Sequence, residues 1–381
     1  MNKSLDRKLA ALHADPRGCR EFLIADAKDA DMAFGIGAPG LSPERHEGEL
    51  RYRTLAAYRE QIRQIVQQGI VDIMLMSAST NDLLTIQERL FDNSHITPAV
   101  RANDTTDIHV FRGSRMAQPA ARPFRTAAID HAQCGSLDCP PSERGRGADL
   151  GLYSVTFNNE LERDLETLQA YKEFREEAER KQFRHFLEVF HPNLPNAVSP
   201  ELLPAFINDA IVRTLAGVPS AGRPVFLKIP YPGPRALEEL VAYDPHLIVG
   251  ILGGSSGTTR DAFQLIHDAQ RHGARVALFG RKINNAESQL AFIEFLRLVV
   301  DGVVNPEEAV RGYHAVLERL KITPHRPLED DQRVTETAMN YAGSTTKSPQ
   351  SSTLDTPPSL AKMTPAERLQ YHQERLRKSF G

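Results

Sequence analysis

Short apolar segments alternate with helix-length amphipathic segments over most of the 381 residues, and this alternation constrains the fold more than any other feature. Several of the apolar runs are hydrophobic at both odd and even positions, which is typical of strands that are covered on both faces. The strands that we expect span residues 22–26, 71–77, 97–102, 150–157, 185–190, 225–230, 247–252 and 276–279.

The segments between these runs have the spacing of amphipathic helices. Segment 54–68, for example, places Leu55, Tyr58, Ile62 and Ile65 on one helical face. The expected helices span residues 54–68, 160–180, 200–215, 234–242, 259–272 and 287–300. Glycines stand where two of these helices should end, at Gly69 and Gly273.

Eight strands with intervening helices predict a parallel α/β architecture, and their number favours a closed (β/α)8 TIM barrel. The main alternative is a doubly wound open sheet, which usually carries a glycine-rich turn directly after its first strand. The only candidate for that turn is GIGAPG at residues 35–40, some nine residues beyond the strand, so it is a weak dinucleotide fingerprint.

Two regions depart from the repeat. Residues 108–146 form an irregular insertion near the third and fourth strands, within which segment 125–132 could add a further strand. At the other end of the chain, we expect a barrel of residues 1–330 to be followed by a C-terminal tail of residues 331–381. We expect its Ser/Thr/Pro-rich part, 343–359, to be disordered and a short basic helix to run from Thr364 to Lys378.

Composition excludes several classes of protein. A net charge of -3, with 41% hydrophobic and 25% charged residues, is typical of a globular protein and gives no reason to expect binding to nucleic acid or to a membrane surface. The chain has neither an apolar run of membrane-spanning length nor the apolar centre of a signal peptide, so we expect a cytoplasmic protein. Its three cysteines predict neither a disulfide framework nor a metal site, and we expect them to be reduced.

Reactive side chains gather at the predicted carboxyl ends of the strands, where barrel enzymes hold their active sites. Lys228 lies within the apolar sixth strand, where burial disfavours an ammonium and favours the nucleophilic amine that a Schiff base requires. Glu188 lies in the same way within the fifth strand and could relay protons to and from such a lysine. The alternative is that Lys228 and Glu188 form a purely structural ion pair.

Other strand ends carry further candidates. Asp26 and Lys28 form a charged pair at the end of the first strand. The loop after the seventh strand contains Gly253, Gly254 and Ser255 just before a helix, and the eighth strand ends in Gly280 and Arg281. Backbone N–H groups, a helix N-terminus and an arginine at these two strand ends predict an anion-binding site.

Several of these motifs resemble the class I (Schiff-base) aldolases of the (β/α)8 barrel type, especially tagatose-bisphosphate and sulfofructose-phosphate aldolases. The resemblance covers roughly residues 20–320 and rests on FLEVF at 186–190, LKIP at 227–230, GGSSGTTRDAF at 253–263 and the Gly-Arg ending of the eighth strand. IADAK at 24–28 and LYSVTFNNE at 152–160 resemble the first and fourth strands of those enzymes. The chain departs from them at Asp149, where they carry a lysine, and at Lys282, which follows the Gly-Arg pair.

The resemblance implies a lyase that reversibly cleaves a phosphorylated or sulfonated ketose, without a metal or cofactor, and that usually assembles into a homo-oligomer. It implies that Lys228 forms the imine while Glu188, Asp26 and Tyr153 take part in catalysis. The residues that it implies for substrate and phosphate binding are Lys28, Arg101, Gly253, Gly254, Ser255, Gly280 and Arg281. Two other functions stay open, namely a barrel isomerase or synthase without imine chemistry and a non-catalytic sugar-phosphate binder.

Overall fold

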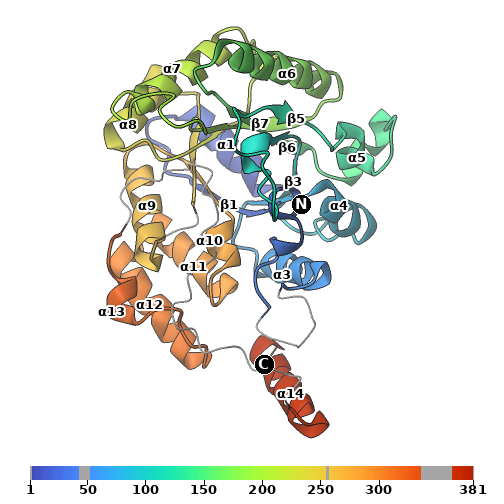
Figure 1. The fold of residues 1–381 in the computed structure, drawn as a ribbon, viewed down its shortest axis with the longest axis vertical. Helices are drawn as coiled ribbons and strands as arrows, with labels where there is room; N and C mark the ends of the chain where they lie inside the picture. Colours follow the sequence, from blue (N-terminus) through green and yellow to red (C-terminus); the bar gives the residue numbers. More distant parts are fainter. Residues whose placement is uncertain (1, 43–51, 255–256, 336–362, 381) are drawn as a thin grey trace.

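A closed barrel of parallel strands forms the centre of the protein (Figure 1). The computed structural model describes residues 2–42, 52–254, 257–335 and 363–380. The barrel strands are β1 Leu23–Lys28, β2 Ile73–Met76, β3 Thr97–Arg101, β6 Leu150–Thr156, β7 Arg184–Phe190, β8 Leu227–Ile229, β9 Val249–Leu252 and β10 Val276–Phe279. They pair in the order β1-β10-β9-β8-β7-β6-β3-β2, and β2 closes on β1. The predicted (β/α)8 barrel is therefore confirmed, and the open-sheet alternative is wrong.

Helices between the strands form an outer layer. The six that match predicted segments are α3 Leu55–Gln68, α6 Leu161–Arg180, α7 Leu203–Ala216, α8 Pro234–Tyr243, α9 Thr259–Arg271 and α11 Gln289–Val300. The ends of α3 illustrate why they form, because Thr54 Oγ1 accepts a hydrogen bond from the amide of Ala57 and Gly69 ends the helix at a left-handed φ of 70°. Two longer helices were not expected from the sequence, α1 Ser4–Ala14 and α12 Pro306–Arg319.

Helix α1 covers the amino-terminal end of the barrel. Its residues Leu5, Leu9 and Leu12 pack in one cluster with inward-facing strand residues such as Leu23 and Phe186. Lys8 Nζ donates to the carbonyl of Phe22 and pairs with Asp72, both of which lie just before a strand begins. Because this end is filled with apolar side chains, the opposite, carboxyl end of the barrel is the place for a functional site.

The insertion after β3 is structured. Strands β4 Asp104–Thr105 and β5 Pro123–Phe124 pair antiparallel beside the barrel. Segment 125–132 adds no strand, since its first four residues have no regular secondary structure and its last four belong to helix α5 Ile129–Cys134. The expectation of reduced cysteines is also wrong for two of the three, because a disulfide joins Cys134 to Cys139, whose Cα atoms lie 6.1 Å apart.

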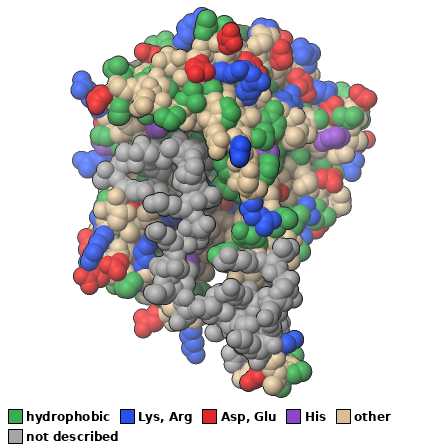
Figure 2. All heavy atoms as spheres, viewed as in Figure 1, with side chains coloured by type: hydrophobic (Ala, Val, Ile, Leu, Met, Phe, Trp, Pro, Cys, Tyr) green, Lys and Arg blue, Asp and Glu red, His purple; other side chains and the backbone are tan. Residues whose placement is uncertain are grey.

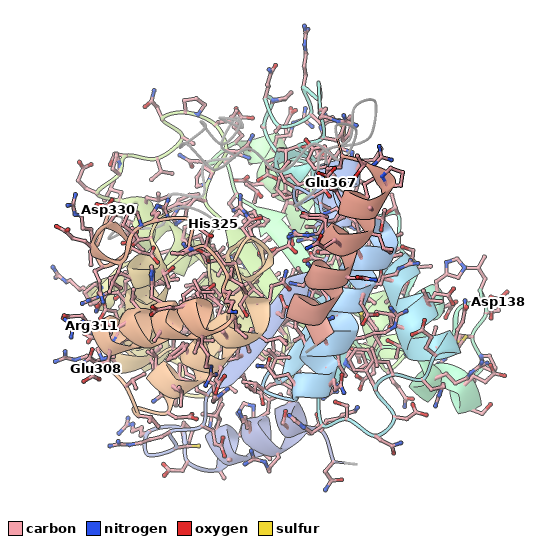
Figure 3. All side chains as sticks on the ribbon, turned by 90° about the horizontal axis from the view of Figure 1, so that it is seen from below. Asp138, Glu308, Arg311, His325, Asp330 and Glu367 are labelled. Carbon is pink, nitrogen blue, oxygen red and sulfur yellow. A yellow bond between two sulfur atoms is a disulfide. The ribbon has the colours of Figure 1, made fainter. Side chains whose placement is uncertain are left out.

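After the barrel the chain continues through the short helix α13 Leu328–Asp331. The predicted disordered segment 343–359 lies outside the described residues. The predicted basic helix is present as α14 Pro365–Phe380, and the amide of Glu367 donates to Thr364 Oγ1 at its first turn. Figure 3 shows Glu367 on this helix and Glu308 and Arg311 on α12.

Charges of both signs are interspersed over the coloured part of the face in Figure 2. This distribution agrees with the small net charge of -3. Among the described residues, no helix combines the length and the apolar character needed to cross a membrane.

Candidate active site

Lys228 and Glu188 meet at the carboxyl end of the barrel. They are register partners on the adjacent strands β8 and β7, and Lys228 Nζ lies 2.5 Å from Glu188 Oε1. Both point into the barrel, because they alternate with Leu227 and Leu187, which face the helices. The side chain of Lys228 is 8% exposed and that of Glu188 2% exposed. Both side chains are thus almost fully buried, and both line a pocket.

The second oxygen of Glu188 is held by a serine. Ser154 Oγ donates to Glu188 Oε2 at 2.6 Å, and an Arg101 nitrogen donates to the same hydroxyl at 3.2 Å. Asn103 fixes this serine from behind, since its amide side chain bonds to both the backbone N–H and the carbonyl of Ser154. The carboxylate of Glu188 is therefore oriented by a buried network with its other oxygen directed at Lys228.

All three guanidinium nitrogens of Arg101 lie near other side chains of the protein. Its Nε donates to Asp29 Oδ2 at 2.5 Å, another nitrogen bonds Ser154, and the third lies 3.8 Å from Glu188 Oε2. Burial alone would lower the pKa of Arg101, but the carboxylates of Asp29 and Glu188 hold it above the ordinary value. Arg101 lines the pocket, as expected, yet its guanidinium bridges two carboxylates and so acts on the position of Glu188.

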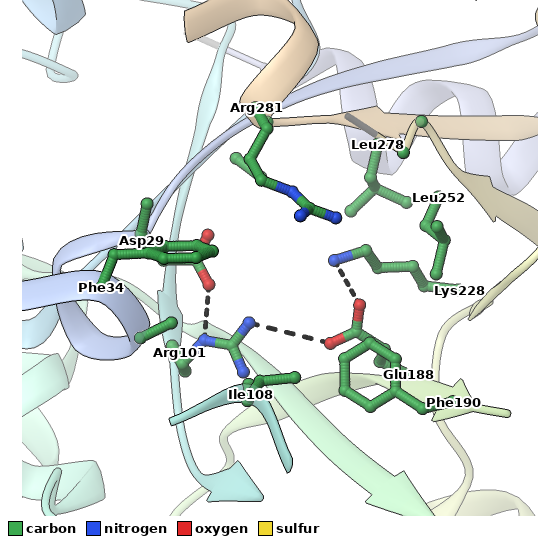
Figure 4. A pocket seen from close by; sticks show the side chains of 16 residues that line it. Asp29, Phe34, Arg101, Ile108, Glu188, Phe190, Lys228, Leu252, Leu278 and Arg281 are labelled. Atoms are coloured by element: carbon green, nitrogen blue, oxygen red, sulfur yellow. Dashed lines mark hydrogen bonds and ion pairs between the residues drawn. The ribbon is translucent and has the colours of Figure 1, made fainter. Parts of the chain in front are cut away.

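The pocket beside this network measures about 590 Å³, including the open space at its mouth (Figure 4). Arg281 points into it opposite Arg101, and Gly253, Gly254 and Gly280 also line it. Two of these glycines have no room for a side chain: a Cβ on Gly253 would lie 2.1 Å from the ring of Phe279, and one on Gly280 would lie 2.8 Å from the carbonyl of Ala27. The backbone of these glycines therefore lines the pocket without side chains on the side of Arg281.

The N-terminus of α9 is not open to an anion, contrary to expectation. Thr258 and Asp261 cap the helix reciprocally, and Asp331 Oδ1 accepts the amide hydrogen of Thr259 at 2.7 Å. A carboxylate from α13 therefore already occupies the place in which a substrate phosphate was expected. Ser255, another expected anion ligand, lies outside the described residues. Of the residues expected at the anion site after strands β9 and β10, Gly253, Gly254, Gly280 and Arg281 line the pocket.

Asp26 and Lys28, both expected to be site residues, are not among the described residues that line this pocket. They alternate along β1 with the inward-facing Ala25 and Ala27, and both are fully buried between the barrel and the helices. Lys28 Nζ lies 3.2 Å from Asp26 Oδ2. Burial raises the pKa of Asp26 and lowers that of Lys28. The acid in this part of the chain that lines the pocket is Asp29, which directly follows β1.

Tyr153, the other expected catalytic residue on the barrel strands, is also not among the described residues that line the pocket. Its ring stacks on Phe174 at a centroid distance of 4.4 Å and lies 5.1 Å from Tyr171, in the layer between barrel and helices. The neighbouring Ser154 faces inward instead, and the sequence analysis missed it. Period-two alternation from Glu188, its register partner, would have indicated this residue.

Asp149, which replaces a lysine of the resembled enzymes, lies at the other end of the barrel. It precedes β6 and pairs with Arg184 at 2.8 Å, and Arg184 in turn contacts Asp6 of α1. Asp149 is therefore not one of the described residues that line the pocket. Among the described residues, no group of three His, Cys, Asp or Glu side chains is placed to hold a metal ion.

No protein-family model matches the chain, and no curated protein matches it in sequence. Solved structures do resemble its fold. A fructose-bisphosphate aldolase from Slackia heliotrinireducens is 15% identical with a TM-score of 0.57, and the match covers 82% of this chain and 91% of that one. An archaeal fructose-1,6-bisphosphate aldolase, with its catalytic lysine covalently bound to the carbinolamine intermediate of the substrate, is 16% identical with a TM-score of 0.52, over 78% of this chain and 99% of that one.

A third structure with the same fold is Cgl0159 from Corynebacterium glutamicum, which is 16% identical with a TM-score of 0.53, over 80% of this chain and 99% of that one. At these identities the likeness concerns the barrel fold. Fructose-bisphosphate aldolases that form Schiff bases are thus among the structural neighbours. The narrower resemblance to tagatose-bisphosphate and sulfofructose-phosphate aldolases stays a prediction.

Proposed function

We propose that this protein is a lyase, a class I aldolase that forms or cleaves a carbon–carbon bond in an anionic ketose through an imine on Lys228. The observation that carries the proposal is the Lys228–Glu188 pair: the charged atoms lie 2.5 Å apart, both side chains are almost fully buried, and both line the pocket. A lysine amine needs a desolvated setting and a neighbouring proton acceptor to attack a carbonyl, and this pair provides both.

In the proposed cleavage reaction, Glu188 accepts a proton from the Lys228 ammonium, and the freed amine attacks the ketone carbon. Glu188 then returns the proton to the carbinolamine hydroxyl, which leaves as water and produces the iminium. The Glu188 carboxylate then takes the proton of the hydroxyl β to the iminium carbon, the carbon–carbon bond breaks, and its electron pair moves towards the iminium nitrogen. The aldehyde departs, the enamine carbon takes up a proton, and water hydrolyses the second product from the lysine.

The network behind Glu188 suits this shuttling role. Ser154 donates to one carboxylate oxygen at 2.6 Å and so leaves the other aimed at Lys228. Arg101 lies 3.8 Å from the same carboxylate oxygen and donates to Ser154 Oγ at 3.2 Å, so it holds both members of the network in place. Ser154 and Arg101 are thus proposed as positioning residues.

The anionic end of the substrate is proposed to bind Arg281 and the backbone around Gly253, Gly254 and Gly280. These groups lie on the β9 and β10 side of the pocket, next to the strand that carries Lys228. Arginine offers paired donors to a phosphate, sulfonate or carboxylate, and glycine backbones allow the anion to come close. A ketose phosphate or sulfonate is therefore the proposed substrate class.

The proposal can be tested without knowing the aldehyde. An imine-forming aldolase exchanges an α-hydrogen of its ketone donor with solvent, because the enamine is reprotonated from water. We expect the protein in deuterium oxide to label dihydroxyacetone phosphate, as followed by proton NMR, and Lys228→Arg to abolish the labelling. Arginine keeps the charge but cannot form the imine, so exchange by the arginine variant would instead favour a barrel isomerase or synthase without imine chemistry.

A further inference from the structure

The pocket wall around Lys228 is unusually poor in partners for sugar hydroxyls. Of the sixteen described residues that line the pocket, eight have apolar side chains, three are glycines and five are charged. None of these sixteen carries a hydroxyl, an amide or an imidazole. Each buried hydroxyl of a bound sugar must find a hydrogen-bond partner, and among the side chains of these sixteen residues only the five charged ones can supply it.

Four of the five charged residues are already engaged with one another. Glu188 pairs with Lys228 at 2.5 Å, and Arg101 pairs with Asp29 at 2.5 Å. The second oxygen of Glu188 accepts from Ser154, which stands behind the wall. These contacts already use part of the hydrogen-bonding capacity of the four charged side chains, and a chain of substrate hydroxyls would have to compete with them.

The apolar side chains of the wall come from distant parts of the chain and meet at the barrel mouth. Ile108, Phe190 and Leu252 form one hydrophobic cluster and are each less than 5% exposed. Figure 4 shows Phe34 across the pocket from Phe190, with Arg281 along a different side. The pocket thus has an anion-binding side and a separate apolar side, and Lys228 reaches the space between them.

From this division we propose that the aldehyde partner of the reaction carries an alkyl or deoxygenated chain, which lies against Ile108, Phe190 and Leu252. The inference rests on the proposed aldolase function and adds the substrate class to it. In the synthetic direction, the enamine carbon on Lys228 bonds to the aldehyde carbon, and the aldehyde oxygen takes up a proton to become the new hydroxyl. Water then hydrolyses the iminium, so the product is a β-hydroxy ketone whose distal part is apolar.

The two aldehydes that test this are propanal and glyceraldehyde, which have the same three carbons and differ by two hydroxyls. With dihydroxyacetone phosphate as donor, we expect kcat/KM for propanal to exceed that for glyceraldehyde by tenfold or more. An apolar pocket commonly discriminates against one added hydroxyl by about 100-fold. Equal use of the two aldehydes, or a preference for glyceraldehyde, overturns the proposal.

Trapping with borohydride separates this inference from the function on which it rests. If dihydroxyacetone phosphate leaves an adduct on Lys228 but the hydroxylated aldehyde is preferred or neither aldehyde gives product, only the apolar-acceptor proposal fails. If no adduct forms and neither aldehyde reacts, the aldolase function fails with it.

A matched pair of variants tests the wall itself. Ile108→Thr places a hydroxyl in the apolar cluster, and Ile108→Val has the same shape without the hydroxyl. Relative to the valine variant, the threonine variant should shift the propanal-to-glyceraldehyde ratio towards glyceraldehyde by about tenfold. An identical ratio in the two variants, with adduct formation on Lys228 intact in both, shows that the cluster does not contact the acceptor and overturns the assignment.

Discussion

Lys228 and Glu188 are direct register partners on neighbouring parallel strands, and their charged atoms lie 2.5 Å apart. Because both strands are held in the closed barrel, the distance depends on the sheet and not on a flexible loop. A buried pair of this kind leaves an uncompensated charge if either member is removed. The arrangement therefore joins reactivity and stability in the same two residues, and variants must be chosen that separate them.

Ser154→Ala tests the role of the network behind Glu188. Loss of a hydrogen bond to a charged group commonly costs about 1.5–3 kcal/mol, so we expect kcat to fall about tenfold to a hundredfold. KM should change less, because Ser154 is not one of the described residues that line the pocket. Steady-state kinetics of carbon–carbon bond cleavage measure both values.

The matched control is the adjacent Tyr153→Phe, which removes a hydroxyl from the opposite face of the same strand. Its ring packs against Phe174 and Tyr171, so kcat should stay at the wild-type value. If the phenylalanine variant loses as much activity as the alanine variant, the effect is one of general packing and the positioning role of Ser154 is contradicted.

Arg281→Ala tests the anion site. We expect KM for a phosphorylated ketose to rise about tenfold to a hundredfold, the value of a charge-assisted hydrogen bond, while kcat at saturation changes little. The neighbouring Lys282→Gln removes a cation whose Nζ donates to the carbonyl of Gly257 at 2.9 Å. Since Lys282 is not among the described pocket-lining residues, its substitution should raise KM less. An equal rise in KM for the two variants would indicate that the positive charge acts at a distance, and would contradict a specific contact between Arg281 and the anion.

Asp104→Asn should change how stability depends on pH. Asp104 is 2% exposed, and burial raises its pKa from 3.8 to about 6 despite the opposing charge of Arg101. An acid with a raised pKa holds its proton more tightly in the folded state, so stability is lost as the pH rises from about 4 through 6. At about 1.4 kcal/mol per pH unit, this ionisation costs about 3 kcal/mol at neutral pH.

The asparagine variant removes that cost. Urea unfolding at pH 4.5 and 7.5 should therefore show a smaller difference between the two pH values for Asp104→Asn than for the wild type. If both proteins lose the same free energy of unfolding between these pH values, the carboxyl of Asp104 titrates normally and the account of its burial is wrong.

The strands and their order along the chain could be predicted because their apolar runs are bounded by clear helix ends such as Gly69. Which face of a strand points inward could not always be predicted. Along β1 and the residue after it, Ala25, Ala27 and Asp29 alternate with Asp26 and Lys28, and all of them except the half-buried Ala27 are buried. Each of the two faces carries a charged residue, so the sequence does not show which face points inward. The packing in the closed barrel places Asp29 at the pocket.

Long-range contacts account for the other differences. The N-terminus of α9 resembles an anion site in sequence, but Asp331 fills it from 72 residues away. Helix α12, in contrast, had a readable start, because Asn305 and Glu308 form a capping box around Pro306. Helix α12 could therefore have been predicted from its local sequence. The occupation of the N-terminus of α9 by Asp331 could not, because it depends on a tertiary contact.

The most direct test of the central claim is to reduce the protein with borohydride in the presence of dihydroxyacetone phosphate and to map the modified residue by peptide mass spectrometry. The account predicts an adduct on Lys228 that disappears in Lys228→Ala and in Lys228→Arg. The absence of an adduct on Lys228, or trapping that persists in the arginine variant, would contradict imine chemistry at this residue.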